Sequence, residues 1–246
     1  MIDLLRAVIL GIIQGATEFL PISSSGHLVI TPWLLGWPAP SLFFDTVLHW
    51  GTLLSILLVF WRDFVDIIVA TLRSIFQRSL ADPNARLGWF LVIGTIPAAL
   101  TGLLLKDFIE ALFESPRAAG VFLLVTAGLL TLSEALARRI RSQTPLEGLR
   151  LSQAVWIGAA QALALAPGLS RSGITIATGL AVGLRRDVAA RFSFLLGTPA
   201  FLGAGLLQLV DALSADGAEV ATQLPALVAG FVASAVVGFI AIRFML

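Results

Sequence analysis

The sequence has no cysteine, and charged residues are scarce. Without cysteine, disulfides, thiol catalysis and cysteine-ligated zinc are excluded. Only 13% of the 246 residues are charged, against roughly 25% in soluble domains, while 58% are hydrophobic. This composition argues against a water-soluble fold. The formal net charge of +1 leaves no concentrated basic face, so we expect membrane lipid as a partner and no nucleic acid.

Long apolar stretches predict membrane-spanning helices, because a span needs about 20 predominantly apolar residues. Four stretches meet this requirement, at 44–61, 88–105, 192–210 and 224–242, and a shorter one at 119–133 spans if it extends by a turn. The N-terminal run 1–20 is also apolar, but it contains Gln14 and Glu18 and leads into a polar motif. We therefore expect it to belong to the mature protein and not to a cleaved signal peptide.

The loops predict how the spans are oriented, since Lys and Arg collect on the cytoplasmic side. Two loops are basic and are expected in the cytoplasm: 62–87 (Arg62, Arg73, Arg78, Arg86) and 137–150 (Arg138, Arg139, Arg141, Arg150). The intervening loop 106–118 is acidic (Asp107, Glu110, Glu114) and should face outward. Segment 152–184 is apolar but interrupted, and a third basic cluster follows it (Arg185, Arg186, Arg191). It should therefore leave and return on one side, as a re-entrant hairpin of two short helices.

An internal repeat links two polar motifs. GIIQGATEFLPISSSGH at 11–27 and GAAQALALAPGLSRSGIT at 158–175 align at a shift of 147 residues. An odd number of spans separates them, so the hairpin formed by 1 to about 40 and the hairpin 152–184 should enter from opposite faces. The predicted fold is an all-α membrane protein with an inverted-topology repeat, two re-entrant hairpins and about five to six transmembrane helices.

We expect the whole chain, 1–246, to form a single membrane domain with repeat halves of approximately 1–136 and 152–246. The third span of the first half, extended by a turn to 119–136 and shifted by 147 residues, falls at 266–283, past Leu246. The second half is thus expected to lack its last span, either because the chain is naturally short or because it has been cut. In inverted repeats the site lies near the midplane, where broken helices from both halves meet.

The two interrupted segments gather polar groups that suit a phosphorylated lipid, and ionisable groups at membrane depth are usually functional. Gln14 and Glu18 lie four residues apart, so on a helix both face one side and can offer oxygens to Mg²⁺. Mg²⁺ commonly takes only one or two carboxylates and completes its shell with water and phosphate oxygens. Arg171 suits bidentate phosphate binding. Gly26 and Gly173 let backbone amides approach an anion.

These groups predict phosphoryl transfer in which a cation and Arg171 neutralise a diphosphate. The attacking group is left open between water and a Ser hydroxyl activated by His or Glu. Ser23, Ser24 and Ser25 in the first loop, and Ser170, Ser172 and Thr175 in the second, are the candidates for phosphate contact.

Simpler roles compete with these assignments. Ser23 and Ser25 equally suit helix capping. His27 can serve a structural hydrogen bond. Arg171 can snorkel to an interface, although its place between two Ser residues favours function. Asp45 and His49, four residues apart within a span, can pair with each other or extend a proton path, and we favour the structural role.

At these residues the chain resembles the undecaprenyl-diphosphate phosphatase family, the bacitracin-resistance type of integral membrane enzyme. The motifs that carry the resemblance read QGATEFLPISSSGH from Gln14 to His27 and PGLSRSGIT from Pro167 to Thr175. The resemblance implies that Glu18 and His27 are catalytic, that Ser24 and Ser170 are nucleophile or phosphate-contact candidates, that Arg171 binds the diphosphate, and that Thr175 supports them. Gln14 stands where some members have a second Glu.

The resemblance further implies hydrolysis of undecaprenyl diphosphate to undecaprenyl phosphate and phosphate, which recycles the lipid carrier for cell-wall synthesis. It implies dependence on Mg²⁺ or Ca²⁺, a multi-pass protein of the bacterial inner membrane, an active site open to the periplasm, and a homodimer.

Three other functions compete with this one. Acid-phosphatase-like lipid phosphatases also carry SGH and SR elements, but they need a His six residues after that Arg, where this chain has Ala177. A polyprenyl-phosphate transporter or flippase is the serious alternative, because paired re-entrant hairpins are typical of transporters. A carrier has less need of a general base, so Glu18 and His27 beside Arg171 favour the enzyme. A structural scaffold leaves both motifs unexplained.

Overall fold

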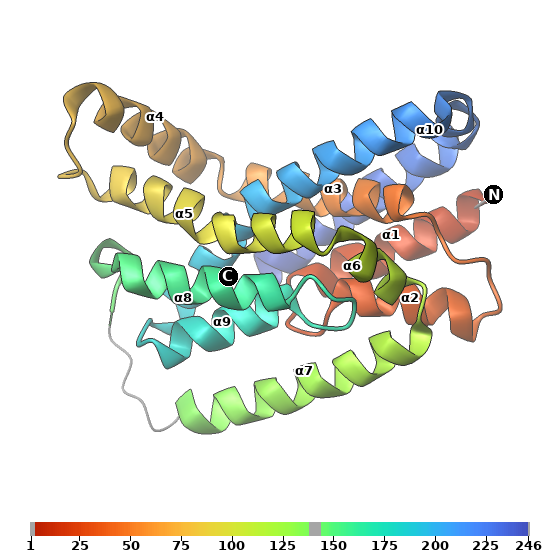
Figure 1. The fold of residues 1–246 in the computed structure, drawn as a ribbon, viewed down its shortest axis with the longest axis horizontal. Coiled ribbons are helices and arrows are strands. Elements are labelled where there is room, and N and C mark those ends of the chain that lie inside the picture. Colours follow the sequence, from red (N-terminus) through yellow and green to blue (C-terminus); the bar gives the residue numbers. More distant parts are fainter. Residues whose placement is uncertain (1–2, 138–143, 246) are drawn as a thin grey trace.

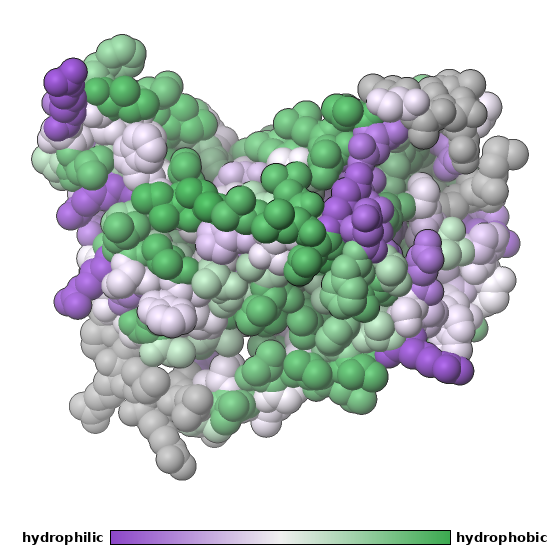
Figure 2. Space-filling model, viewed as in Figure 1, coloured by the Kyte–Doolittle hydropathy of each residue, from purple (hydrophilic) through white to green (hydrophobic). Residues whose placement is uncertain are grey.

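The computed structural model describes residues 3–137 and 144–245, and the regular elements in those ranges are helices (Figure 1). Five helical segments are long and apolar enough to cross a membrane: α3 (Leu42–Val59), α5 (Pro83–Leu104), most of α7 (Pro116–Ala137), and two parts of α10 (Arg186–Met245), namely Arg186–Ala212 and Thr222–Met245. These segments confirm the five spans predicted from hydropathy. Apolar surface spreads across the middle of the molecule in Figure 2, and hydrophilic residues gather toward its sides. The chain is a multi-pass membrane protein.

Helix α10 contains two spans because it doubles back on itself. Trp50 Nε1 donates to the Phe201 carbonyl, and Ser55 Oγ donates to the Ala235 carbonyl. On a straight helix those two carbonyls would lie about 50 Å apart at 1.5 Å per residue, yet both reach one short stretch of α3. In Figure 1 the lighter blue part of α10 runs outward and the darker part returns.

Two hairpins of short helices lie between the spans. The first pairs α1 (Leu4–Glu18) with α2 (Ser24–Leu34), and the second pairs α8 (Leu151–Leu163) with α9 (Arg171–Ala181). The longest, α1, has 15 residues and is about 22 Å long, too short for a hydrocarbon core of about 30 Å. A shift of 147 residues carries the bounds of α2 onto those of α9. In Figure 1 the N-terminus lies at the right, whereas the turn η1 (Leu146–Gly148) before α8 lies at the left.

Matching polar contacts start the second helix of each hairpin. Ser23 Oγ accepts the Gly26 amide at 3.3 Å and lies 3.3 Å from Ser25 Oγ. Ser170 Oγ accepts the Gly173 amide at 3.1 Å and lies 3.4 Å from Ser172 Oγ. The same residue types thus make the same N-cap in both halves. Each cap satisfies an amide that a helix start leaves unpaired.

Close helix packing also repeats in the two halves. A Cβ at Gly11 would collide with the carbonyl of Gly230, and a Cβ at Gly158 would collide with the carbonyl of Gly94. The matched glycines therefore let α1 approach α10 and α8 approach α5 at backbone contact, as small residues do in membrane helices. Phe19 packs edge-on against Phe194, with ring centroids 5.5 Å apart, and ties the end of α1 to the main buried cluster.

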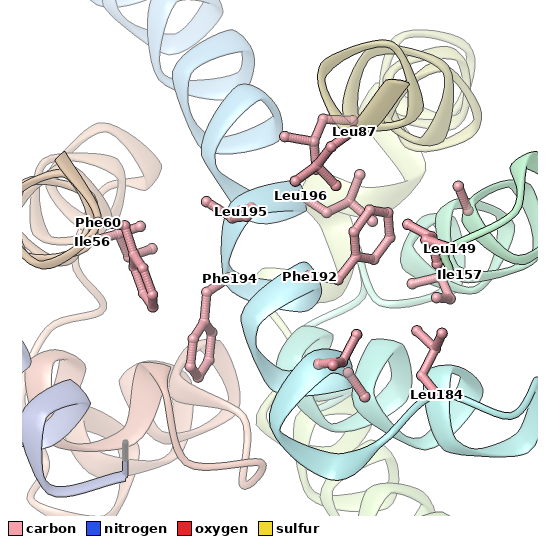
Figure 3. Close-up of a cluster of buried hydrophobic side chains, with 14 of the residues drawn as sticks. Ile56, Phe60, Leu87, Leu149, Ile157, Leu184, Phe192, Phe194, Leu195 and Leu196 are labelled. Carbon is pink, nitrogen blue, oxygen red and sulfur yellow. The ribbon is translucent and has the colours of Figure 1, made fainter. Parts of the chain in front are cut away.

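The main buried cluster gathers α3, α5, α8 and α10 around the middle of the molecule (Figure 3). Phe192 points toward Leu149 and Ile157, whereas Phe194 projects from the other face of the helix. Both rings are fully buried. Neighbouring helices pack against both faces of α10 here. The start of α10, around Phe192 and Phe194, is therefore held in position beside the hairpins.

The charged loops contain more structure than the sequence predicted. Residues 62–87, expected as a loop, are mostly helical: α4 (Trp61–Gln77) packs Ile67, Ala70 and Ser74 inward, against α5. The acidic loop 106–118 contains α6 (Lys106–Phe113). Of the second basic loop, Arg138, Arg139 and Arg141 lie outside the described residues.

Candidate active site

The two hairpin loops meet at the carboxylate of Glu18. Glu18 is the last residue of α1 and is 5% exposed. Its Oε1 accepts a hydrogen bond of 2.8 Å from Arg171 Nη2, and Arg171 is the first residue of α9. Its Oε2 accepts a hydrogen bond of 2.5 Å from Ser24 Oγ, and Ser24 is the first residue of α2. Residues predicted separately in the two motifs are therefore in direct contact.

Two further side chains approach the same carboxylate. Gln14 Nε2 donates to Glu18 Oε2 at 2.9 Å and lies 3.4 Å from Thr52 Oγ1. His49 Nε2 lies 3.5 Å from Glu18 Oε2. The His49 Nδ1 atom lies 2.8 Å from the Asp45 carbonyl, so Nδ1 is the donor there and the ring is fixed in orientation. His49 and Asp45 therefore pair within their span through the Asp45 backbone, as predicted, and the imidazole also reaches Glu18, which the sequence did not predict.

The guanidinium of Arg171 is fixed on several sides. Its Nη1 donates to the Ser193 carbonyl at 3.0 Å, and its Cζ lies 4.5 Å from the centroid of the Phe201 ring. This geometry excludes snorkelling to an interface. Thr175 Oγ1 donates to the Arg171 carbonyl at 2.7 Å and lies 2.5 Å from Ser193 Oγ, so Thr175 supports the start of α9. Neither Ser193 nor Phe201 could be picked out from the sequence, since both lie in an apolar span.

Two polar atoms at this site are buried without a hydrogen-bond partner among the described residues, Gln14 Oε1 and Arg171 Nε. An unpaired buried polar atom is costly, so such atoms suggest contacts with a ligand. Gln14 Oε1 is an oxygen ligand that suits a hard cation, and Arg171 Nε–H is a donor that suits an anion. In the described ranges, no group of three or more His, Asp or Glu residues is placed to hold a metal by itself.

His27 lies in the first loop but makes a different contact. Its Nδ1 is 2.7 Å from the Ser23 carbonyl, which makes Nδ1 the donor and leaves Nε2 to act as an acceptor in the neutral ring. The side chain is half-buried. The hydrogen bonds that join Glu18, Ser24 and Arg171 do not include it, so its catalytic role stays a prediction.

The remaining motif residues serve mainly to assemble the two loops. Ser23 is the N-cap of α2, as the simpler interpretation predicted, whereas Ser25 is not a cap. Ser170, for which no cap was predicted, is the N-cap of α9. Ser172 Oγ lies 3.3 Å from the carbonyls of Glu18 and Leu20 and so ties the second loop to the first.

The expected amide contacts of Gly26 and Gly173 with an anion are not available, because both amides donate to the caps. The two glycines instead allow close approach. A Cβ at Gly26 would lie 2.8 Å from the Cα of Gly168. At Gly173, a Cβ would lie 3.3 Å from that of Pro21.

A cavity of about 880 Å³ has a described lining that does not include Glu18, Ser24 or Arg171 but approaches the first loop. Its lining includes Leu28 and Val29, which follow His27, and Asp45, one turn before His49. Lys106 closes one side by donating to Asp211 at 2.6 Å. This hydrogen bond raises the pKa of the Lys106 ammonium, which keeps it charged. The lining also includes Glu110 and Glu114 of the acidic loop 106–118, at the acidic end of the molecule, and that loop was predicted to face outward.

Comparisons with known proteins agree with the motifs. The model of the family described as bacitracin resistance protein BacA matches residues 7–246. A protein named undecaprenyl-diphosphatase from Methanosphaera stadtmanae is 44% identical over 256 residues, covering 100% of this chain and 90% of its own. Proteins of the same name from Rubrobacter xylanophilus and Pelobacter propionicus are 47% and 46% identical, covering 100% and 99% of this chain and 90% and 88% of their own. The chain therefore belongs to the bacitracin resistance protein BacA family.

Proposed function

We propose that this protein hydrolyses undecaprenyl diphosphate to undecaprenyl phosphate and inorganic phosphate, and so recycles the lipid carrier used in cell-wall synthesis. The observation that carries the proposal is the contact of Glu18 with both Ser24 and Arg171, which brings a carboxylate, a hydroxyl and a guanidinium together inside an apolar membrane protein. The name shared by the relatives, undecaprenyl-diphosphatase, supports the same substrate.

In the proposed reaction Ser24 attacks the terminal phosphorus while Glu18 accepts the proton of its hydroxyl. The hydrogen bond that Ser24 Oγ donates to Glu18 Oε2 supports this assignment. Undecaprenyl phosphate leaves, and water then hydrolyses the phosphoserine to release phosphate. Arg171 stabilises the charge of the transferring group, with its unpaired Nε–H free to donate to a phosphate oxygen. We assign His27 Nε2 as the acceptor of a proton from that water.

The starts of α2 and α9 carry Ser24 and Arg171, so two helix N-termini flank the position proposed for the diphosphate. Helix N-termini carry partial positive charge and favour anions. Gln14 and Glu18 would hold the Mg²⁺ or Ca²⁺ ion, with phosphate and water completing its shell. When bound, the ion would neutralise diphosphate charge.

We also propose that the protein lies in the bacterial inner membrane with its site open to the periplasm, and that it forms a homodimer. The cavity among residues of the acidic end supports the periplasmic opening, because cytoplasmic loops carry the excess of Arg. Light scattering of the detergent-solubilised protein, corrected for bound detergent, tests the dimer. A mass of one 26.1 kDa chain would contradict it.

The first test is phosphate release from a polyprenyl diphosphate by purified protein with Mg²⁺. Glu18→Gln and Arg171→Ala should each lower kcat/KM by a factor on the order of 10³, the loss that follows removal of a buried group acting on the transition state. Glu147→Gln and Arg73→Ala are the matched controls, because both side chains are exposed and distant from the site in sequence. A folded wild type that binds the lipid but releases no phosphate would contradict the proposal.

The cation can be tested without activity. When Mn²⁺ replaces Mg²⁺ in protein without lipid substrate, the electron paramagnetic resonance signal of Mn²⁺ should broaden as the ion binds. Gln14→Leu should weaken this binding, because the unpaired Gln14 Oε1 is lost. Gln14→Glu should strengthen binding, because a carboxylate adds charge. Equal Mn²⁺ binding by all three proteins would exclude Gln14 as a ligand.

A further inference from the structure

Helix α7 makes few contacts with the rest of the protein, and the buried hydroxyl of Thr126 lies at one of them. Only 11% of its apolar span is buried, the lowest share among the five described spans. Thr126, near its middle, is nevertheless just 3% exposed. A polar side chain that is buried on a helix so largely exposed must be held by a specific contact.

That contact is with the backbone of the second hairpin loop. Thr126 Oγ1 donates to the Gly168 carbonyl at 2.7 Å and accepts the Ser170 amide at 3.1 Å. One hydroxyl therefore satisfies a carbonyl and an amide two residues apart. Gly168 has φ +97°, a conformation that favours glycine, and a Cβ there would lie 2.8 Å from that of Phe122. The loop is thus pressed against α7 and fixed to it.

The contact reaches the proposed site in two steps. Ser170, whose amide is held by Thr126, is the N-cap of α9, and Arg171 follows it directly. Ser172 then ties the same loop to the Glu18 and Leu20 carbonyls of the first loop. We propose that Thr126 is a positioning residue which sets the place of Arg171 against Glu18. This inference rests on the proposed phosphatase function.

The test compares three substitutions in the full chain. Thr126→Val keeps the shape and removes the hydroxyl, and Thr126→Ser keeps the hydroxyl. Thr131→Val is the matched control, because the exposed Thr131 hydroxyl bonds only the Ala127 carbonyl of its own helix. Thr126→Val should lower kcat on the order of 10- to 100-fold, as small misplacements of reacting groups do. Thr126→Ser and Thr131→Val should stay within about threefold of wild type.

A double substitution separates positioning from general destabilisation. Lys has a point charge and lacks the fixed fork of Arg. In an Arg171→Lys protein, Thr126→Val should therefore lower kcat by less than about a further twofold, because both substitutions affect the same interaction. The same loss in both backgrounds would mean that Thr126 acts independently of Arg171 and would overturn the inference. If Thr126→Val does not fold, Thr126→Ala takes its place.

Hydrogen exchange provides a readout that does not depend on activity. Peptides covering 164–171 should exchange on the order of tenfold faster in Thr126→Val, because the Ser170 amide loses its acceptor. They should be unchanged in Thr126→Ser and Thr131→Val. Unchanged exchange in Thr126→Val would overturn the inference even for an active enzyme. If Thr126→Val exchanges faster but the wild type releases no phosphate, the contact between Thr126 and the loop stands and only the proposed function is rejected.

Discussion

At the residue scale, the carboxylate of Glu18 collects contacts from four helices. Gln14, Ser24 and Arg171 belong to the two motifs, so the sequence predicted that they would lie together. His49 was assigned to structure because Asp45, one turn away, offered a local partner. Its contact with Glu18 depends on how α3 packs against α1, which spacing along the chain does not reveal. The available signal was that an ionisable residue within a span is usually functional.

The position of His49 predicts a measurable contribution to activity. His49→Leu should lower kcat/KM about 10- to 100-fold, because it removes a polar partner 3.5 Å from the buried Glu18 carboxylate, and a buried charged group left without a partner costs about 1–3 kcal/mol or more. His49→Gln should retain most of the activity, because its side-chain amide can donate a hydrogen bond to Glu18. Phosphate release by the two folded variants checks this. Equal activity in His49→Leu and wild type would show that the 3.5 Å contact has no role in catalysis.

Substitutions of the adjacent Ser23 and Ser24 should have different effects, one on stability and the other on activity. Ser24→Ala should lower kcat by a factor on the order of 10³ or more, because the proposed nucleophile is lost. Ser23→Ala should cost only about 1 kcal/mol of stability, the usual effect of removing an N-cap. Phosphate release and thermal unfolding measured on both variants separate the two effects. A larger loss of activity in Ser23→Ala than in Ser24→Ala would reverse the assignment of roles.

At the element scale, backbone contact at glycine sets the positions of the hairpins. Gly158→Ala places a Cβ against the Gly94 carbonyl and should lower stability by about 1–3 kcal/mol, the usual cost of overpacking. Gly128→Ala on α7 is the control, because a Cβ there meets nothing within 4 Å. Thermal unfolding in one detergent compares them. A Gly158→Ala protein as stable as Gly128→Ala would mean that α5 and α8 can separate without cost.

Hydropathy and cap residues predicted the elements well, and their limits have physical causes. The five spans follow from uninterrupted apolar runs, and the start of α2 follows from Ser23, whereas Ser25 was wrongly considered an equal candidate for the cap. Helix α4 was not predicted, because the four arginines in residues 62–87 were taken to indicate a loop. Its pattern is amphipathic, with Ile67, Ala70 and Ser74 buried on one face. Charge identifies the side of the membrane but does not exclude a helix.

At the scale of the whole molecule, the repeat explains why two motifs 147 residues apart form one site. Each half contributes a hairpin whose second helix begins at the middle of the molecule. The sequence predicted that the hairpins enter from opposite faces, but it could not predict which atoms meet, because those contacts depend on the angle between the halves. Thr126 illustrates this limit, since nothing in the polarity of α7 distinguishes it from Thr131.

The orientation of the molecule can be tested because the chain has no native cysteine. Glu114, at the end of α6, and Ser79, just after α4, are exposed and separated by the single span α5. Since Arg62, Arg73, Arg78 and Arg86 surround Ser79, that end should be cytoplasmic. A membrane-impermeant maleimide should therefore label Glu114→Cys in cells with a permeable outer envelope, and Ser79→Cys only after the inner membrane is opened. The reverse pattern would place the cavity on the cytoplasmic side, and labelling of both sites in closed cells would mean that α5 does not cross the membrane.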